Sequence, residues 1–205
     1  AGAMLGAAGT IVQRLTGNPL ASPEVLGVGA GAGAGLAVVV LIDITAGLSW
    51  QLAGSAAGAF IVLVAMLAVA ARSNFGPERL LLAGVAMSAV CSAFLTAIIA
   101  LGNAQSYVLL RWLSGSTSDA TMSQAWLALA LLALTCIPPL LAFRWLDILP
   151  LGSTAARSLG LPLKPARFVL IGLTALVTAF AAIFLGPLSF VGLIAPHLAR
   201  LSGLA

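Results

Sequence analysis

Long stretches without a charged residue constrain this chain more than any other feature. Only 7% of its 205 residues are charged and 61% are hydrophobic, whereas a soluble domain carries roughly 25% charged residues. An apolar helix needs about 20 residues to cross the hydrocarbon of a bilayer. The sequence therefore predicts an all-α, polytopic transmembrane helix bundle. The uncharged stretches are Ala1–Gln13, Val25–Ile42, Ile44–Ala71, Leu80–Leu110, Ala120–Phe143 and Phe168–Ala199.

About seven crossings fit into these stretches. Alternating the connections between them places Arg111 on one side and the other eight basic residues on the opposite side, which the positive-inside rule makes cytoplasmic. Because these eight are scattered among helix ends, they do not predict nucleic-acid binding. The predicted spans are about 1–16, 25–42, 50–71, 79–101, 124–143, 167–186 and 188–199. The eight basic residues are Arg14, Arg72, Arg79, Arg144, Arg157, Lys164, Arg167 and Arg200.

Glycine and polar residues interrupt the two longest stretches. Gly102 and Asn103 mark where the chain leaves the bilayer, so we expect residues 106–117 to form an extracytoplasmic surface helix. The run LGPLS at 185–189 predicts a tight turn between a full span and a half-length one. Broken helices of this kind line cavities in transporters. Since the sequence opens inside an apolar stretch, we expect an interior slice of a longer polypeptide.

The sequence holds no motif for catalysis. It contains no G-x-x-x-x-G-K-[ST] run, and its single lysine, Lys164, precedes Pro165, so any ATP must be bound by a partner. One histidine, His197, and the lack of an intramembrane carboxylate argue against hydrolysis, metal binding and proton relay. Cys91 and Cys136 lack the spacing of a zinc or redox site and predict packing. We therefore expect no enzyme activity, no cofactor and no metal site in this chain.

Two predicted helices carry small residues at helical spacing. Gly27, Gly31 and Gly35 predict one helix face that packs closely against another helix, and the odd spacing of this glycine run excludes a dinucleotide-binding loop. A second stripe of small, weakly polar side chains runs along the span at 79–101. It predicts either tight packing, with hydroxyls bonded to the backbone, or the lining of a solute path. Its members are Gly84, Ser88, Cys91, Ser92 and Thr96.

The connection from Phe143 to Phe168 is the longest on the predicted cytoplasmic side. Its prolines flank the run STAARSLG at 153–160, which predicts a short exposed helix. With Ala155 and Ala156 on its surface, such a helix suits docking against a partner. A solvated connector is the alternative.

Five segments along the chain share the sequence patterns of one known family. They are NPLASPEVLG (18–27), RLLLAGVAMS (79–88), RWLSGST (111–117), LPLGSTAARSLGL (149–161) and GPLSFVGLIAPHLAR (186–200). In this order, across the whole chain, they resemble the permease subunits of iron-siderophore and vitamin B12 ABC importers. The first, third and fifth are most similar to the ferric hydroxamate permeases, particularly the second half of those proteins. The family's upstream extracytoplasmic segment has no counterpart here.

The resemblance implies a type II ABC importer permease unit of ten helices, of which residues 1–205 are a partial domain truncated at both ends. The implied partners, in a bacterial inner membrane, are a second permease unit, a cytoplasmic ABC ATPase dimer and a periplasmic siderophore-binding protein. The loop at 149–165 would hold the coupling helices that contact the ATPase, and the stripe on the span at 79–101 would face the translocation path. The implied coupling residues are Leu151, Gly152, Ala155, Ala156, Arg157 and Gly160.

The resulting hypothesis is a permease that moves iron(III)-hydroxamate by alternating access. Iron would travel inside its chelator, in keeping with the lack of metal-ligand clusters. Arg111 and Asp119, on the predicted extracytoplasmic face, are expected to contact the receptor through complementary charge. A bulky residue at Gly152 or Ala156 is expected to uncouple transport from ATP hydrolysis. Vitamin B12 and haem are alternative cargoes, and an ion-driven secondary transporter or a structural membrane protein are alternative classes.

Overall fold

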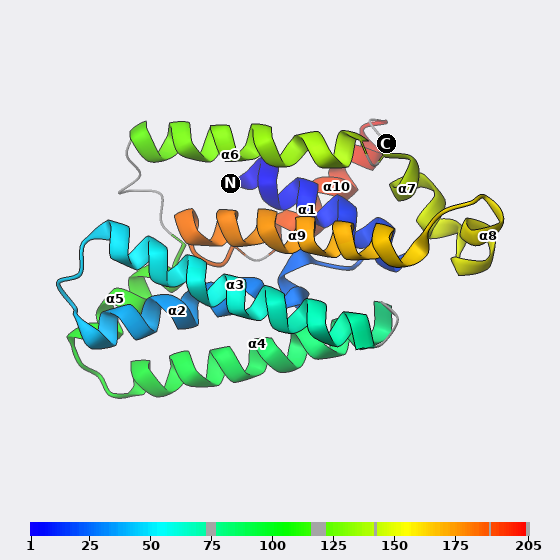
Figure 1. Cartoon of the computed structure of the whole chain (residues 1–205). Coiled ribbons are helices and arrows are strands. Elements are labelled where there is room, and N and C mark those ends of the chain that lie inside the picture. Colours follow the sequence, from blue (N-terminus) through cyan, green and yellow to red (C-terminus); the bar gives the residue numbers. More distant parts are fainter. Residues whose placement is uncertain (73–76, 116–121, 142, 189, 204–205) are drawn as a thin grey trace.

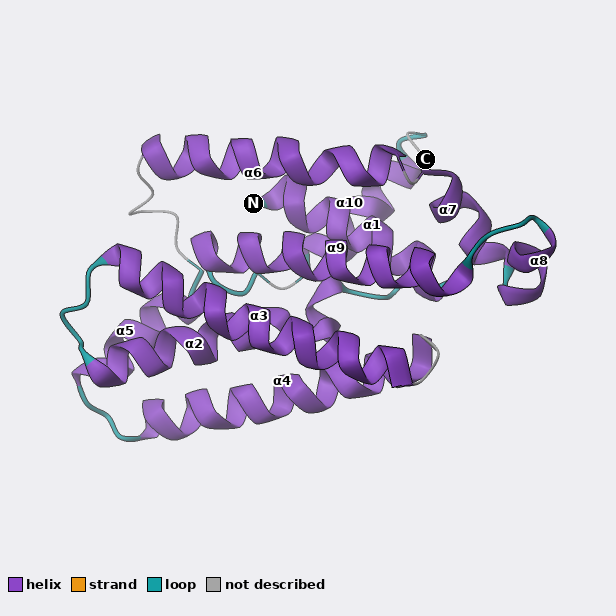
Figure 2. Ribbon diagram, viewed as in Figure 1, coloured by secondary structure: helices purple, strands orange, loops and turns teal. Residues whose placement is uncertain are grey.

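The computed structural model describes residues 1–72, 77–115, 122–141, 143–188 and 190–203. Every regular element within these ranges is a helix, which confirms the all-α prediction (Figure 2). The elements are α1 (Gly2–Thr16), the 3-10 turn η1 (Pro23–Leu26), α2 (Val28–Ile42), α3 (Leu48–Arg72), α4 (Pro77–Ala100), α5 (Ala104–Leu113), α6 (Met122–Leu141), α7 (Phe143–Ile148), the 3-10 turn η2 (Leu149–Leu151), α8 (Ser153–Ser158), α9 (Leu163–Leu185) and α10 (Val191–Leu201).

The long helices lie roughly parallel to one another in an elongated bundle (Figure 1). The C-terminal ends of α1, α3 and α10 meet the N-terminal ends of α4 and α9 at one end, where α7 and α8 also lie (Figure 1). These are the helix ends that carry the eight basic residues, whereas α5, with Arg111 in its last turn, lies at the opposite end. The structure thus gathers the predicted cytoplasmic connections together.

Three helices are long and apolar enough to cross a membrane, judged by length and composition within the described residues. They lie in α3, α4 and α9, where three of the predicted spans were placed. The helices α2 and α10 are also apolar but shorter, with 15 and 11 residues. At 1.5 Å per residue, α2 is about 22 Å long and does not cross a hydrocarbon core of about 30 Å by itself.

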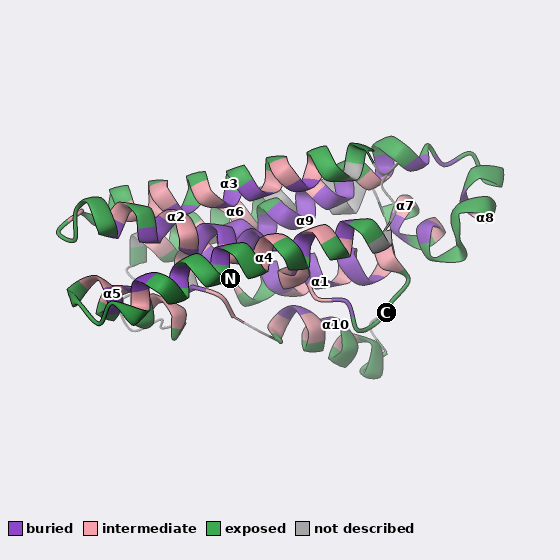
Figure 3. Ribbon diagram, turned by 90° about the horizontal axis from the view of Figure 1, so that it is seen from below, coloured by how far each residue is buried: buried purple, intermediate pink, exposed green. Residues whose placement is uncertain are grey.

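α9 is the centre of the bundle. It contacts α1, α2, α3 and α6, and most of its side chains are buried (Figure 3). Its buried hydroxyls, those of Thr174 and Thr178, donate to backbone carbonyls one turn earlier at 2.7 and 2.8 Å, so they need no partner outside the helix. By contrast, α3 and α4 turn large apolar side chains outward, among them Phe60 and Leu82, which are 64% and 70% exposed. Such a surface suits lipid or a neighbouring subunit.

The glycine face predicted on α2 is present in part. A Cβ at Gly35 would lie 2.1 Å from the carbonyl oxygen of Gly54 in α3, and one at Gly31 would lie 2.9 Å from that of Gly58. These contacts confirm close packing of α2 on α3. Gly27 does not belong to that face, because it precedes the helix with a left-handed φ of 78° and packs on α4 instead.

The surface helix α5 begins and ends a few residues before the predicted 106–117. Asn103 and Ser106 form a reciprocal capping box that fixes its start. Leu109 is fully buried against the bundle, whereas Tyr107 is 72% exposed. The helix therefore lies with one face on the end of the bundle.

Candidate functional site

Between α1 and α2 the chain turns back into the bundle. Gly17, whose φ is 64°, caps the C-terminal end of α1, and η1 then contacts α4, α9, α1 and α10. A Cβ at Gly27 would lie 2.9 Å from the carbonyl oxygen of Gly84, about two turns into α4. Pro23 lies against Gly192 at the start of α10. Non-helical backbone therefore reaches the interior of the bundle, which is tolerated at membrane depth only where protein surrounds it or it lines a cavity.

A second break separates α9 from α10. Gly186 ends α9 with φ 74° and ψ −173°, a combination that is essentially restricted to glycine. Phe190, which precedes α10, has a left-handed φ of 71°, unusual for a residue with a bulky side chain. A Cβ at Gly186 would lie 2.2 Å from the carbonyl oxygen of Trp112 in α5. The predicted turn at 185–189 is confirmed in its described part; Ser189 lies outside the described residues.

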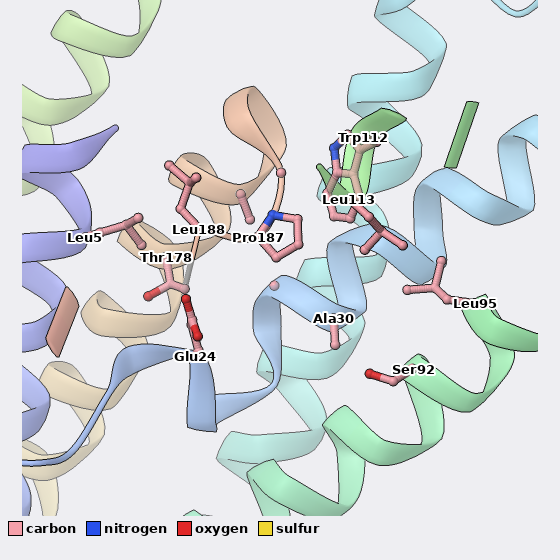
Figure 4. Close-up of a pocket in the computed structure, with 13 residues that line it drawn as sticks. Leu5, Glu24, Ala30, Ser92, Leu95, Trp112, Leu113, Thr178, Pro187 and Leu188 are labelled. Carbon is pink, nitrogen blue, oxygen red and sulfur yellow. The ribbon is translucent and has the colours of Figure 1, made fainter. Parts of the chain in front are cut away.

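A cavity of about 170 Å³ lies between the two breaks (Figure 4). Most of its walls are apolar, and they come from α1, η1, α2, α4, α5, α9 and the segment that follows α9. In the view of Figure 4, Glu24 and Thr178 stand at one side of the cavity and Ser92 and Leu95 at the other. The lining residues are Leu5, Glu24, Gly29, Ala30, Ser92, Leu95, Trp112, Leu113, Thr178, Ala182, Gly186, Pro187 and Leu188.

Glu24 places a carboxylate inside the bundle. It follows the η1 cap, where the Ser22 hydroxyl accepts a hydrogen bond from the Glu24 backbone N–H at 3.4 Å, and it lines the cavity as a half-buried residue. None of the predicted spans contains a carboxylate, so sequence reasoning missed Glu24 as a residue that lines this cavity. Glu24 lies between two predicted spans in the sequence, whereas the chain returns into the bundle there. An ionisable residue that lines an interior cavity is a functional candidate.

The predicted stripe on α4 does not stay on one face. Gly84 and Cys91 are buried, Ser88 is half-buried, and Ser92 and Thr96 are exposed. A repeat of four residues advances by about 40° per step around a helix of 3.6 residues per turn, so the stripe winds from the η1 contact to the surface. Only Ser92 among the five lines the cavity. The Thr96 hydroxyl donates to the carbonyl of Ser92 at 2.8 Å.

The loop after α6 has a well-defined backbone. At its end the N–H of Leu161 donates to the carbonyl of Ala156, and that of Gly160 donates to Arg157, both at 2.9 Å. With a φ of 77° at Gly160, this is a Schellman cap. Gly152, before α8, has φ 92° and ψ 160°, again a region reserved for glycine. The short exposed helix predicted at 153–160 is confirmed as α8, which ends at Ser158.

The exposed surface of this loop differs from the prediction. Ala156 is 0% exposed and belongs to the main core cluster, so placing it on the helix surface was wrong. It is the third residue from the end of α8, and the Schellman cap folds Leu161 back over it. Leu151 and Leu159 are instead 62% and 60% exposed, and Arg157 is exposed beside them. Leu159 was missed because a lone leucine carries no signal of exposure.

Polar contacts tie α1 to the elements at the end of the bundle that carries α8. Arg14 forms an ion pair with Asp147 of α7. Gln13, 3% exposed, donates to the carbonyl of Leu193 at 3.3 Å and accepts from Arg200 at 2.9 Å. Through these contacts α1 connects the loop after α6 to α10.

The opposite end of the bundle carries Arg111, one of the two predicted receptor contacts. Arg111 is exposed in the last turn of α5, and Asp119 lies outside the described residues. Asp43 follows α2 there, and the hydroxyl and backbone N–H of Thr45 donate to its carboxylate at 2.6 and 2.8 Å. These two bonds lower the pKa of the Asp43 carboxyl group.

Comparison with known proteins gives a consistent result. The FecCD transport family matches residues 1–203. The iron(3+)-hydroxamate import system permease proteins FhuB of Escherichia coli strain K12 and Salmonella typhimurium are 45% and 46% identical over 99% of this chain, which spans 31% and 30% of their lengths. The vitamin B12 import system permease protein BtuC of Escherichia coli O127:H6 is 38% identical over 99% of this chain and 62% of its own length.

A solved structure shares the fold. It is an inward-facing conformation of a metal-chelate type ABC transporter, with a TM-score of 0.89 and 24% identity, and the match covers 100% of this chain and 66% of that chain. The agreement confirms the arrangement of the helices in the bundle. This chain spans about a third of the length of the FhuB proteins and less than two thirds of BtuC.

Proposed function

This chain belongs to the FecCD transport family, and on that premise we propose that it is part of the permease of an ATP-driven importer for iron(III)-hydroxamate chelates. The importer lies in a bacterial inner membrane, which the permease crosses several times. The observation that carries the choice of cargo is the 45% and 46% identity to two FhuB proteins over nearly the whole chain.

The loop at 149–165 is the proposed contact with the ATPase dimer. Leu151, Arg157 and Leu159 are exposed on it, while two glycine-dependent turns and the buried Ala156 hold its shape. A loop that keeps its shape transmits displacement, and the ion pair between Arg14 and Asp147 links the adjoining α7 to α1. Closure of the ATPases would therefore be passed to the bundle through α7 and α1. The chain itself hydrolyses no ATP in this proposal.

Alternating access requires a path that opens to one side of the membrane at a time. We assign the exposed part of the α4 stripe, Ser92 and Thr96, to the wall of that path, with a second permease unit forming the opposite wall. Their hydroxyls interact weakly with a passing solute, which suits a bulky complex whose iron is already bound by its chelator. At the end of the bundle that carries α5, Arg111 is proposed to contact the periplasmic binding protein through charge.

Vitamin B12 is the second candidate cargo. The 38% identity to a BtuC protein over 99% of this chain favours it specifically. The bulk of the cobalamin would require the same wide, weakly interacting path.

Uptake by cells that lack their own FecCD-type permeases tests the proposal. The complete gene, expressed with its ATPase and binding protein, should restore uptake of radioactive ferric hydroxamate and leave that of cobalamin at background. A matching strain whose ATPase cannot hydrolyse ATP should take up neither. Restored cobalamin uptake without ferric hydroxamate uptake would assign the second cargo, and uptake without ATP hydrolysis would contradict an ATP-driven importer.

A further inference from the structure

The polar atoms of the cavity between the two breaks favour a hydrogen-bond donor as guest. The Thr178 hydroxyl uses its hydrogen in the bond to the Thr174 carbonyl at 2.8 Å, so toward any further partner its oxygen acts only as an acceptor. Glu24 contributes a carboxylate, which in its ionised form has about four acceptor positions and no donor. Both residues line the cavity. Two acceptor groups in one wall select a guest that brings N–H donors and positive charge.

The other walls favour an aliphatic stem on such a guest. Leu5, Leu95, Leu113 and Leu188 line the cavity together with the ring of Trp112. These side chains cover methylene groups, and an indole ring also attracts a nearby cation through its π face. An alkylammonium group combines both properties, since it has an apolar stem and a head with three N–H donors.

The size of the cavity limits what enters it. Sites that enclose drug-sized ligands have volumes of about 300–1,000 Å³, whereas this cavity measures about 170 Å³. It therefore accommodates an arm of a few carbon atoms and excludes a whole iron chelate. The guest must be a side arm of a larger molecule that remains outside.

The position of the cavity indicates where that larger molecule lies. Ser92 lines the cavity and is exposed on α4, so the cavity reaches the surface beside the face that we assign to the translocation path. Glu24 and Thr178 lie away from Ser92 in the view of Figure 4. An arm that enters beside Ser92 would reach them with its terminal group.

We propose that this cavity binds the alkylammonium arm of a cationic iron chelate, with the Glu24 carboxylate and the Thr178 hydroxyl as acceptors, and so makes the importer favour cationic over neutral cargo. The inference depends on the proposed function, because it places the cargo in the path beside α4. Glu24 is then the residue that determines this preference.

Paired substrates test it in the complete transporter. Two ferric hydroxamates are compared that differ only in a terminal primary ammonium, free in one and N-acetylated in the other. We expect E24Q to lower the uptake ratio of cationic to acetylated chelate about tenfold, in line with the loss of one charge-assisted hydrogen bond. T178V should lower the ratio less, because it removes an uncharged acceptor. The matched control D43N makes the same chemical change in an exposed turn and should leave the ratio at the wild-type value.

The outcomes separate the two proposals. If the wild-type transporter takes up neither chelate, the proposed function fails. If it takes up both and E24Q keeps the wild-type ratio, or D43N lowers it equally, the inference is overturned. Should E24Q not reach the membrane, inhibition of wild-type uptake decides: butylammonium should inhibit uptake of the cationic chelate more strongly than n-butanol, and equal inhibition would refute the site.

Discussion

The contact between Gly84 and η1 gives the sharpest prediction for stability. A Cβ at Gly84 would lie 2.0 Å from the carbonyl oxygen of Val25 and 3.0 Å from the Cα of Leu26. Both are backbone atoms, so no side-chain rotation relieves the overlap. Because carbon and oxygen pack no closer than about 3.3 Å, η1 and α4 must separate by more than about 1 Å in the variant G84A.

The expected cost follows from this displacement. Overpacking a close contact destabilises a protein by about 1–3 kcal/mol, and an overlap with rigid backbone belongs near the upper value. We therefore expect G84A to lower the free energy of unfolding by about 2–3 kcal/mol. The separation also moves the turn that carries Glu24, so transport should fall together with stability.

Gly172 in α9 provides the matched control. No atom outside its own helix backbone lies within 4 Å of a Cβ placed there, and alanine in a helix interior is favoured over glycine by roughly 0.5–1 kcal/mol. G172A should thus be neutral or stabilising, although the chemical change is the same. The two variants are compared by thermal unfolding of the purified complete transporter and by uptake. Equal stability of G84A and wild type would refute the steric argument, as would a loss in G172A as large as that in G84A.

Three further predictions concern the end of the bundle that carries α8. A156L should destabilise the loop by about 1–3 kcal/mol because Ala156 is fully buried. L159S should leave the melting temperature unchanged and weaken co-purification of the ATPase. A loss of stability in L159S with none in A156L would contradict the assignment of Ala156 to the core and Leu159 to the surface. R14A should change the free energy of unfolding by less than about 1 kcal/mol, since the side chains of Arg14 and Asp147 are 37% and 61% exposed, and a larger loss in a denaturation series would count against this. G160A should lower the free energy of unfolding by roughly 1–2 kcal/mol because alanine does not favour the left-handed φ of 77°. The melting temperature should fall, whereas the folded fraction should still bind the ATPase.

The helices could be predicted from the sequence because charge and apolarity act along the chain. α3, α4 and α9 coincide with three predicted spans, and LGPLS at 185–189 revealed the break before α10. Glycine and proline change the backbone wherever they stand, so their signal survives without knowledge of neighbours. The same holds for the turns on either side of α8, where Gly152 and Gly160 have positive φ values.

Burial on individual helix faces could not be predicted in the same way. Ala155 and Ala156 are identical as sequence, yet only Ala156 lies under the Schellman cap and is fully buried. The repeat that begins at Gly84 looked like one face because a spacing of four approximates a helical turn. The advance of this repeat around the helix shows only in the folded bundle, where η1 covers Gly84 and Ser92 stays exposed. Contacts between distant segments decide such outcomes.

Glu24 shows which sequence signal does report on a distant contact. As a charged residue just before the uncharged stretch Val25–Ile42, Glu24 is assigned by the sequence to a loop. The length of the helix that follows argues otherwise, because α2 has 15 residues, about 22 Å, against about 30 Å of hydrocarbon. Here a capped turn, Ser22–Pro23, precedes a helix that is too short to span by itself, and the non-helical chain at that turn lies inside the bundle. A charge in that chain is then an interior charge, and it needs polar neighbours that only the assembled cavity supplies.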